Sequence, residues 1–334
     1  MLEVSVRNEE ASTCENTPRV IALSGGIGGA KLALGLYRVL PAEDLMVVVN
    51  TGDDFDHLGL RICPDIDTTL YTLAGLADPE RGWGRREETW GFMKALASLG
   101  GETWFQLGDA DLALHVERTR RLAAGQLLSD ITTDVARRLG VTAAVVPMSD
   151  AAVHTRILTA DGELDFQDYF VRRRCEPPVI SFRFVGAATA RPAARVVRAL
   201  RHAGLDAIVI CPSNPYLSID PILALAELRT LLGRSQVPVI AVTPLIGGRA
   251  LKGPTTKIMA ELALPLTPMA VAAHYAGLID GFVLDEQDAA LRSAFACPVH
   301  ITNTRMRTLD DRERLAREVL GFAASLRANP AADP

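Results

Sequence analysis

Apolar residues from Arg19 onward follow two alternating patterns: short runs rich in β-branched residues, and longer segments with helical spacing. Short continuous apolar runs are typical of strands buried on both faces of a parallel sheet, which intervening helices would cover. We expect strands at seven places: Val20–Ser24, Leu45–Asn50, Ala143–Val146, Asp206–Ile210, Val237–Val242, Gly281–Leu284 and Val299–Ile301. The pattern therefore predicts an α/β fold of the three-layer, Rossmann-like kind with a mostly parallel sheet.

Two segments depart from this alternation. Residues 153–184 alternate apolar and polar positions, and we expect an antiparallel hairpin there, with its turn at Asp161-Gly162 and its second arm at Glu163–Val171. Residues 67–139 hold several helix-periodic segments and no convincing strand, which predicts a helical insert. We expect residues 1–18 to be a disordered leader and residues 19–330 to form one domain carrying this insert.

Composition narrows the class of protein. The chain has 334 residues, 49% of them hydrophobic, and a net charge of -5, so it can bury a core but lacks the basic surface that nucleic acid would need. Its five cysteines are odd in number and widely spaced, which argues against a disulfide framework and fits a reducing cytoplasm. The sequence shows neither a signal peptide nor an apolar run of membrane-spanning length.

A glycine-rich segment follows the first expected strand, with Gly25, Gly26, Gly28 and Gly29 ahead of Lys31. Such a strand-to-helix turn lets backbone N–H groups approach an anion at the positive end of a helix, so the segment is a candidate phosphate cradle. It is neither a complete dinucleotide fingerprint, because Lys31 replaces the third glycine, nor a Walker A loop. A tight turn required only for packing is the alternative.

An acidic stretch follows the second expected strand, with Asp53 directly after it and Asp65 and Asp67 shortly beyond. Ligands in open α/β sheets bind outside the carboxyl ends of the strands, where these carboxylates fall. One or two of them would hold a hard cation such as Mg²⁺, shared with substrate phosphates. A ribose-binding acid, a helix cap at Asp65 and solvated loop carboxylates are the alternatives.

Two further groups suit ligand recognition. The loop Ser213-Asn214-Pro215 follows the strand expected at Asp206–Ile210, and its rigid backbone could fix an amide and a hydroxyl, although an ordinary proline-rich turn is the alternative. The three tryptophans, Trp83, Trp90 and Trp104, all lie in the expected insert. They would either stack on a flat ligand ring or pack the insert against the sheet.

Several sequence blocks occur together and in order: GGIGGAK, NTGDD, CPDIDT, RGWG followed by ETW, LGDADLALH, PMSD, FQDYFV and PSNPYLSIDPI. From about Val20 to the last helix, they resemble the 2-phospholactate transferase family of coenzyme F(420) biosynthesis. The resemblance implies a Mg²⁺-dependent enzyme that takes a phosphorylated three-carbon acid from a guanosine-diphosphate-activated donor. The acceptor would be 7,8-didemethyl-8-hydroxy-5-deazariboflavin, and GMP would be released.

The resemblance also implies roles for particular residues. Nucleotide binding would fall to Gly25, Gly26, Gly28, Gly29, Lys31, Ser213, Asn214 and Pro215. Catalysis would fall to Asp53, Asp65 and Asp67, the metal to Asp53 and Asp67, and the deazaflavin to Asp67, Gln106 and Trp90. We expect small molecules as the partners, and the sequence does not decide whether the donor acid is lactate, enolpyruvate or glycerate, or whether the chain forms a homodimer.

The alternative function belongs to a related gluconeogenesis-factor group, which shares the glycine loop and the Ser-Asn-Pro loop but binds nucleotide-sugars as a regulator. The tryptophan-bearing insert and the CPDIDT block favour the transferase, because a regulator has no need of an aromatic surface for a tricyclic acceptor. A nicotinamide-dependent dehydrogenase is less favoured, since the fingerprint is broken at Lys31.

Overall fold

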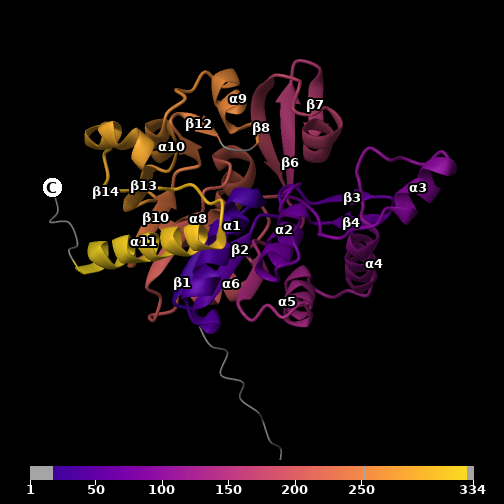
Figure 1. Cartoon of the computed structure of the whole chain (residues 1–334), viewed down its shortest axis with the longest axis horizontal. Coiled ribbons are helices and arrows are strands. Elements are labelled where there is room, and N and C mark those ends of the chain that lie inside the picture. Colours follow the sequence, from indigo (N-terminus) through magenta and orange to yellow (C-terminus); the bar gives the residue numbers. More distant parts are fainter. Residues whose placement is uncertain (1–17, 251–252, 329–334) are drawn as a thin grey trace, which may run out of the picture.

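The centre of the molecule is a seven-stranded sheet in which all neighbouring strands run parallel (Figure 1). The structure is a computed structural model that describes residues 18–250 and 253–328. In spatial order its strands are β14 (Val299–Thr302), β13 (Gly281–Asp285), β10 (Val239–Val242), β9 (Ala207–Ile210), β1 (Val20–Ser24), β2 (Leu45–Val49) and β5 (Ala144–Pro147). The seven expected strands are therefore confirmed, with small shifts at their ends. Apart from Pro18, the leader expected at residues 1–18 lies outside the described residues.

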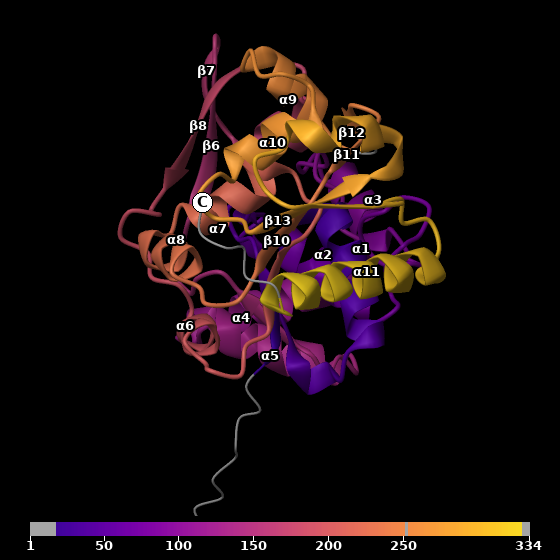
Figure 2. The same ribbon diagram turned by 90° about the vertical axis from the view of Figure 1, so that its left-hand side faces the viewer.

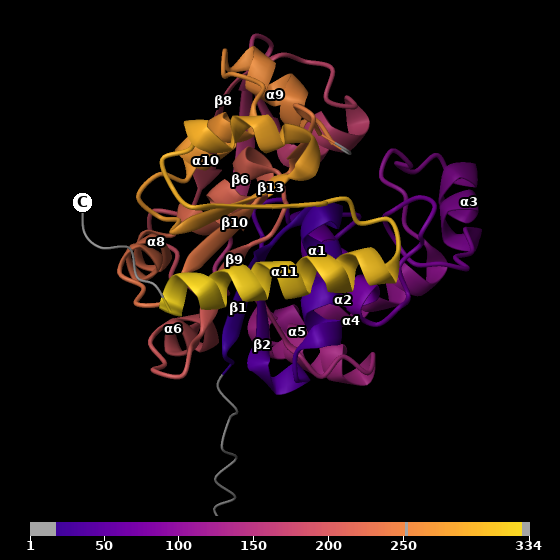
Figure 3. The same ribbon diagram turned by 60° about the vertical axis from the view of Figure 1, so that its left-hand side comes forward.

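The sheet is buried on both faces, as the continuous apolar runs predicted. In β1, Val20 and Ala22 face one hydrophobic cluster, whereas Ile21 and Leu23 face another. The first cluster is covered by α1 (Gly26–Val39), α2 (Pro64–Leu73), α5 (Leu128–Arg138) and α11 (Leu309–Ala328). The second is covered by α6 (Ala194–Leu200), α7 (Asp220–Leu223), α8 (Ala226–Gly233), α9 (Thr255–Glu261) and α10 (Pro268–His274). Figures 2 and 3 show α11 packed across α1, which completes the three-layer arrangement.

The glycine-rich segment is shorter as a loop than the sequence suggested. Helix α1 begins at Gly26, so only Gly25 connects it to β1. Gly26 itself has a φ of 62°, a left-handed conformation that a side chain would strain. The remaining glycines therefore form the first turn of the helix and place its N-terminus at the carboxyl edge of the sheet.

A small antiparallel sheet stands beside the main one, in the order β7-β6-β8. It is formed by β6 (His154–Thr159), β7 (Gly162–Asp165) and β8 (Val179–Val185), so the expected hairpin is confirmed. The length of its second arm was wrong: β7 ends at Asp165, and η2 (Asp168–Arg172) is a single π-helical turn. The turn of the hairpin also lies one residue earlier, because Gly162 already pairs with Thr159.

Residues 67–139 serve two purposes. Helices α2 and α5 cover the sheet, whereas α3 (Gly91–Ser98) and α4 (Asp109–Ala123) lie beside a hairpin of β3 (Phe55–His57) and β4 (Leu60–Ile62). We call β3, β4, α3 and α4 the lobe; it projects to the right in Figure 1. The lobe has its own small core around Ile62, Met93 and Leu107. That residues 67–139 act as one inserted unit stays a prediction.

The remaining elements are short connections. They are η1 (Ala42–Asp44), η3 (Pro215–Ile219), β11 (Leu245–Ile246), β12 (Arg249–Ala250) and η4 (Glu286–Ala294). Among residues 18–250 and 253–328, no helix combines the length and the apolarity needed to cross a bilayer.

Candidate functional site

A cavity with a volume of about 490 Å³ lies at the carboxyl edge of the main sheet. Its walls come from the segments that follow five strands: Gly25 after β1, Asp53 after β2, Ser213 after β9, Thr243 after β10 and Thr304 after β14. Loops after neighbouring parallel strands converge at one edge, which explains why these residues meet. The cavity continues from this edge toward the lobe, where Trp83 and Trp104 line it.

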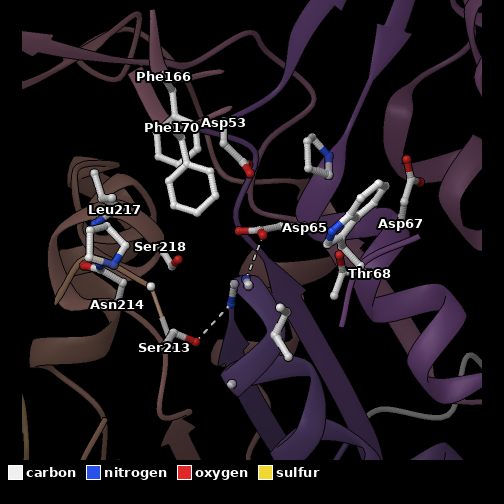
Figure 4. A pocket seen from close by; sticks show the side chains of 18 of the residues that line it. Asp53, Asp65, Asp67, Thr68, Phe166, Phe170, Ser213, Asn214, Leu217 and Ser218 are labelled. Atoms are coloured by element: carbon white, nitrogen blue, oxygen red, sulfur yellow. Dashed lines mark hydrogen bonds between the residues drawn. The ribbon is translucent and has the colours of Figure 1, made fainter. Parts of the chain in front are cut away.

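The N-terminus of α1 forms one wall of the cavity and is held on both sides. The Gly25 N–H donates to Ser213 Oγ at 3.2 Å, and the Gly26 N–H donates to Asp65 Oδ1 at 2.7 Å (Figure 4). A helix leaves its next N–H groups, those of Ile27 and Gly28, without partners inside the helix, and both residues line the cavity. This wall can therefore receive an anion.

Close packing also requires these glycines. A Cβ on Gly28 would lie 2.3 Å from the Pro212 carbonyl oxygen, and one on Gly29 would lie 2.5 Å from Ser213 Oγ. The loop after β9 thus rests directly against the first turn of α1. The two sequence interpretations, phosphate cradle and packing, are compatible, because the same close approach brings Ser213 to the helix N-terminus.

Asp53 and Asp65 form a pair of buried carboxylates joined by one amide. Asn50 Nδ2 donates to Asp65 Oδ2 at 2.9 Å and to Asp53 Oδ1 at 3.3 Å, while the Gly52 N–H fixes Asn50 Oδ1 at 2.8 Å. Both carboxylates line the cavity, although the whole residues are 5% and 6% exposed. In Figure 4, Asp65 lies between the start of α1 and the Asp53 side chain.

The electrostatics of this pair are unfavourable without a cation. Burial, followed by the charge of Asp65, raises the pKa of Asp53 well above its ordinary value. Burial likewise raises the pKa of Asp65 to about 6, although the Asn50 amide and the Gly26 N–H oppose that rise. Two adjacent oxygen ligands that resist ionisation in isolation suit a hard divalent cation, which would neutralise both. The neighbouring Asp54 faces away from this cavity and lines a separate, smaller one.

Asp67 is engaged differently from the other two carboxylates. Arg118, buried on α4, donates to both of its oxygens, with Nη1 at 3.1 Å from Oδ2 and Nη2 on Oδ1. Burial raises the pKa of Asp67, and the Arg118 charge opposes the rise. This ion pair ties the N-terminus of α2 to the lobe. Asp67 lines the cavity, but its oxygens already have a cationic partner, and its contact with the acceptor stays a prediction.

His115 and Asp111 continue this network toward Tyr71. His115 Nδ1 lies 3.6 Å from Asp67 Oδ2, its Nε2 lies 3.3 Å from Asp111 Oδ2, and the Tyr71 hydroxyl donates to Asp111 Oδ1 at 2.5 Å. Asp67, Asp111 and His115 offer ligand atoms within 4.8 Å of one another, which is a geometry that could hold a metal ion. Arg118 Nη1 lies 3.5 Å from His115 Nδ1, however, and would repel a cation placed there.

Sequence reasoning missed Arg118, Asp111 and His115. A signal was present, because the three residues are spaced by four and three positions and so share one face of a helix. What the sequence could not supply was the partner, since Asp67 lies 51 positions from Arg118. Only the docking of α4 beside α2 joins them.

The Ser213-Asn214-Pro215 loop lies against the N-terminus of α1. Asn214 Oδ1 accepts from the N–H groups of Tyr216 and Leu217 at 3.0 and 3.2 Å, which caps η3. Asn214 Nδ2 is buried at the cavity wall without a hydrogen-bond partner among the described residues. This amide N–H group is therefore available to a ligand. The hydroxyl of Ser218, which also lines the cavity, could accept a hydrogen bond from a ligand (Figure 4).

The predicted acceptor residues fall in two places. Gln106 lines the cavity and donates through Nε2 to the Thr103 carbonyl oxygen at 2.7 Å. Trp90 is not part of the cavity wall; it packs against the lobe core beside Met93 and Leu107. Trp83 and Trp104 are the tryptophans that line the cavity, and their stacking on a ligand ring stays a prediction.

Two motifs of the lobe are explained by reciprocal helix capping. Asp109 accepts from the N–H groups of Gly91 and Phe92 at 2.9 Å each, while Glu88 accepts from the N–H groups of Ala110 and Asp111 at 2.9 and 3.0 Å. Asp109, the first residue of α4, caps α3, and Glu88, which precedes α3, caps α4. The two caps join α3 to α4. The ETW and LGDAD blocks are thus accounted for by structure before any ligand is considered.

The chain is similar to known proteins over nearly its whole length. The family model described as 2-phospho-L-lactate transferase CofD matches residues 20–320. The chain is 39% identical to the phosphoenolpyruvate transferase of Streptomyces avermitilis over 92% of this chain and 99% of that protein. It is 37% identical, over the same shares, to the 2-phospho-L-lactate transferase of Methanocaldococcus jannaschii.

Among solved structures, a UPF0052 family protein of Bacillus halodurans is similar with a TM-score of 0.59, 14% identity, and coverage of 91% of this chain and 99% of that one. At that identity the likeness concerns the fold alone. The family match covers nearly all of the main sheet, the lobe and the cavity, so the chain belongs to the 2-phospho-L-lactate transferase family.

Proposed function

We propose that this transferase moves a phosphorylated three-carbon acid from a guanosine-diphosphate-activated donor to the terminal hydroxyl of 7,8-didemethyl-8-hydroxy-5-deazariboflavin. In the step, the hydroxyl oxygen bonds to the phosphorus that carries the acid, and the bond from that phosphorus to the bridging oxygen breaks, which releases GMP. The names of the relatives support transfer of a phosphorylated acid, and the cavity supports the two substrates.

The observation that carries the proposal is the order of groups along one cavity. An anion-receiving helix N-terminus and the Asn214 amide stand at one end, the Asp53–Asp65 pair follows, and Trp104 stands toward the lobe. A nucleotide diphosphate placed on α1 would have its phosphates beside the carboxylates, with a flat acceptor beyond them. Lys31, on the first turns of α1, lines the same wall and would add positive charge near the phosphates.

For the cation we favour Asp53 and Asp65 as ligands, in place of the Asp53 and Asp67 predicted from sequence, because Asp67 already pairs with Arg118. Magnesium bound there would neutralise phosphate charge as the phosphoryl group is transferred. A carboxylate of the same pair receives the proton of the attacking hydroxyl. The residues of α1 and the Ser213 loop hold the donor in line, so no covalent enzyme intermediate is required.

An assay with deazariboflavin and each guanylylated donor in turn, carrying lactate, enolpyruvate or glycerate, tests this proposal. GMP release and the mass of the product are followed with magnesium and with excess chelator. We expect magnesium-dependent GMP release and a product heavier than the acceptor by the phospho-acid for at least one donor. GMP release without acceptor modification, or no turnover with any donor, would contradict the proposal.

A further inference from the structure

A pair of stacked phenylalanines lines the cavity on the side opposite the lobe. Phe166 and Phe170 come from the segment that follows β7, and their ring centroids lie 5.4 Å apart with an interplanar angle of 16°. Phe170 is 38% exposed, although it is a large apolar residue on the cavity wall. Figure 4 shows both rings on the same side as Asp53.

The backbone that presents these rings is an unusual one. Residues Asp168–Arg172 form a π-helical turn, closed by the Arg173 N–H donating to the Asp168 carbonyl oxygen at 2.8 Å. Such turns are rare and are frequently found at functional sites. Tyr169 anchors this π-helical turn, because its side chain is fully buried and Lys257 Nζ lies 3.5 Å from its hydroxyl. The turn therefore buries Tyr169 and leaves its neighbour Phe170 facing the cavity.

The segment is also tied to the carboxylate pair. Gln167 Nε2 donates to the Asp53 backbone carbonyl at 3.2 Å, and Gln167 is only 4% exposed. Because Phe166 directly precedes this anchor, the phenylalanine pair is held at a fixed position relative to Asp53. A ligand ring resting on the pair would present its side chain toward the carboxylates.

A second aromatic group faces the cavity from the lobe. Trp104 and Phe105 line the cavity, and Phe55 and His57 back them, with ring centroids 4.8 to 6.1 Å apart. The guanidinium of Arg172 lies 5.8 Å from the centre of the Trp104 ring. The π-helical turn and the lobe therefore approach each other at Arg172, which brings the two aromatic groups to one part of the cavity.

We propose that Phe166 and Phe170 form the second wall of the acceptor subsite and, with Trp104 and Phe105, select a flat fused-ring acceptor. This inference rests on the proposed transfer to a deazaflavin. Aromatic rings prefer offset-stacked or edge-on contacts, and two aromatic walls favour a planar ring over a flexible sugar or peptide of the same volume. The hydrogen bond from Gln167 then sets the distance between the ring and the reacting hydroxyl.

Steady-state kinetics of Phe166→Ala and Phe170→Ala test the inference, with acceptor and donor varied separately. We expect the KM for deazariboflavin to rise about tenfold in each variant, as the loss of one aromatic contact would give, while the KM for the donor changes less than about twofold. Phe170→Tyr keeps a ring and should retain the wild-type KM. Leu158→Ala, at a residue that is 40% exposed on β6 and not on the cavity wall, is the matched control.

The outcomes separate the two levels of the proposal. If the wild-type chain does not transfer to deazariboflavin, the proposed function fails and the subsite fails with it. If the wild type is active but the alanine variants keep the wild-type acceptor KM, or raise the donor KM instead, only the acceptor subsite is overturned. Thermal unfolding of each variant, and its acceptor affinity measured by tryptophan fluorescence, distinguish a lost contact from a lost fold.

Discussion

The two ends of the cavity are built in different ways. The carboxylate end, comprising Asp53, Asp65, the start of α1 and the Ser213 loop, consists of residues that directly follow strands of the main sheet or cap α1. The aromatic end, comprising Trp104, Phe105, Phe166 and Phe170, comes from the lobe and from the π-helical turn. The first end is held by backbone N–H groups and one amide, whereas the second depends on how separate elements dock.

Under the proposed function, the two ends would have different roles. A rigid edge of a parallel sheet suits the phosphates and the cation, where misplacement of an ångström would slow the reaction. A surface assembled from added elements can change with the acceptor while the edge stays the same. Between the ends, the Asp67–Arg118 ion pair fixes the lobe to α2. Breaking this pair therefore tests how the lobe is held in place, separately from the chemistry at the carboxylate end.

Arg118→Met should have the largest effect on stability, because it leaves Asp67 buried without its cationic partner. We expect a loss of about 3–5 kcal/mol in the free energy of unfolding, measured with urea. The double variant Arg118→Met/Asp67→Leu should recover much of the loss. Arg120→Met is the control, because Arg120 is an exposed residue of the same helix. A cost for Arg118→Met no greater than that control would mean that the pair does not hold the lobe.

Asp53→Asn should have the largest effect on turnover. It removes one carboxylate of the pair, and we expect a fall in kcat on the order of 100- to 1000-fold, comparable to the loss of one charge-stabilising group. Folding should be retained, because a neutral amide removes both the cost of burying a charge and the repulsion from Asp65, which together raise the pKa of Asp53. The control is Asp56→Asn, whose side chain is 68% exposed on β3, just after Asp53 in the sequence. Equal activity in both variants would remove Asp53 from the site.

Gly28→Ala tests the contact between α1 and the loop after β9. The added methyl group would meet the Pro212 carbonyl, so we expect a loss of about 1–3 kcal/mol and weaker binding of GDP. Gly321→Ala in α11 meets nothing within 4 Å and should stabilise the protein by about 0.5–1 kcal/mol. If GDP affinity is unchanged in Gly28→Ala, the helix N-terminus is not the phosphate site.

A further effect concerns pH and the buried carboxyl of Asp54, next to Asp53 in the acidic stretch. Burial raises its pKa to about 8, so the folded state retains a proton that the unfolded chain releases near pH 4. The folded state then binds more protons between these values, and its stability contribution is lost as pH rises from 4 through 8. The wild type should therefore lose stability relative to Asp54→Asn across this range, as measured by urea unfolding. A difference that stays constant with pH would contradict this assignment.

The sequence predicted the carboxylate end better than the aromatic end, for a physical reason. Strand positions follow from local apolar runs, and parallel strands bring their following loops together, so Gly25, Asp53 and Ser213 could be placed in one site. The sequence did not reveal that Asn50 links the carboxylates or that Gly28 packs on Pro212, because both contacts depend on tertiary structure.

The aromatic end could be predicted only in part. The tryptophan cluster indicated an aromatic surface, but the sequence did not distinguish Trp104, on the cavity wall, from Trp90, in the lobe core. The alternation of residues 163–171 favoured a strand, and the π-helical turn that replaces its second half turns Phe170 into the cavity. Local pattern does not register this change, because the burial of Tyr169 beside Lys257 determines it.

Acceptor binding with the nucleotide end filled is the most direct measurement of the central claim, that one cavity holds donor and acceptor at different ends. Tryptophan fluorescence is followed as deazariboflavin is titrated into the protein, with and without saturating GDP and magnesium. We predict saturable quenching in both titrations, with an acceptor affinity that GDP leaves unchanged or strengthens. Displacement of the acceptor by GDP, or an unchanged spectrum at saturating acceptor, would contradict the account.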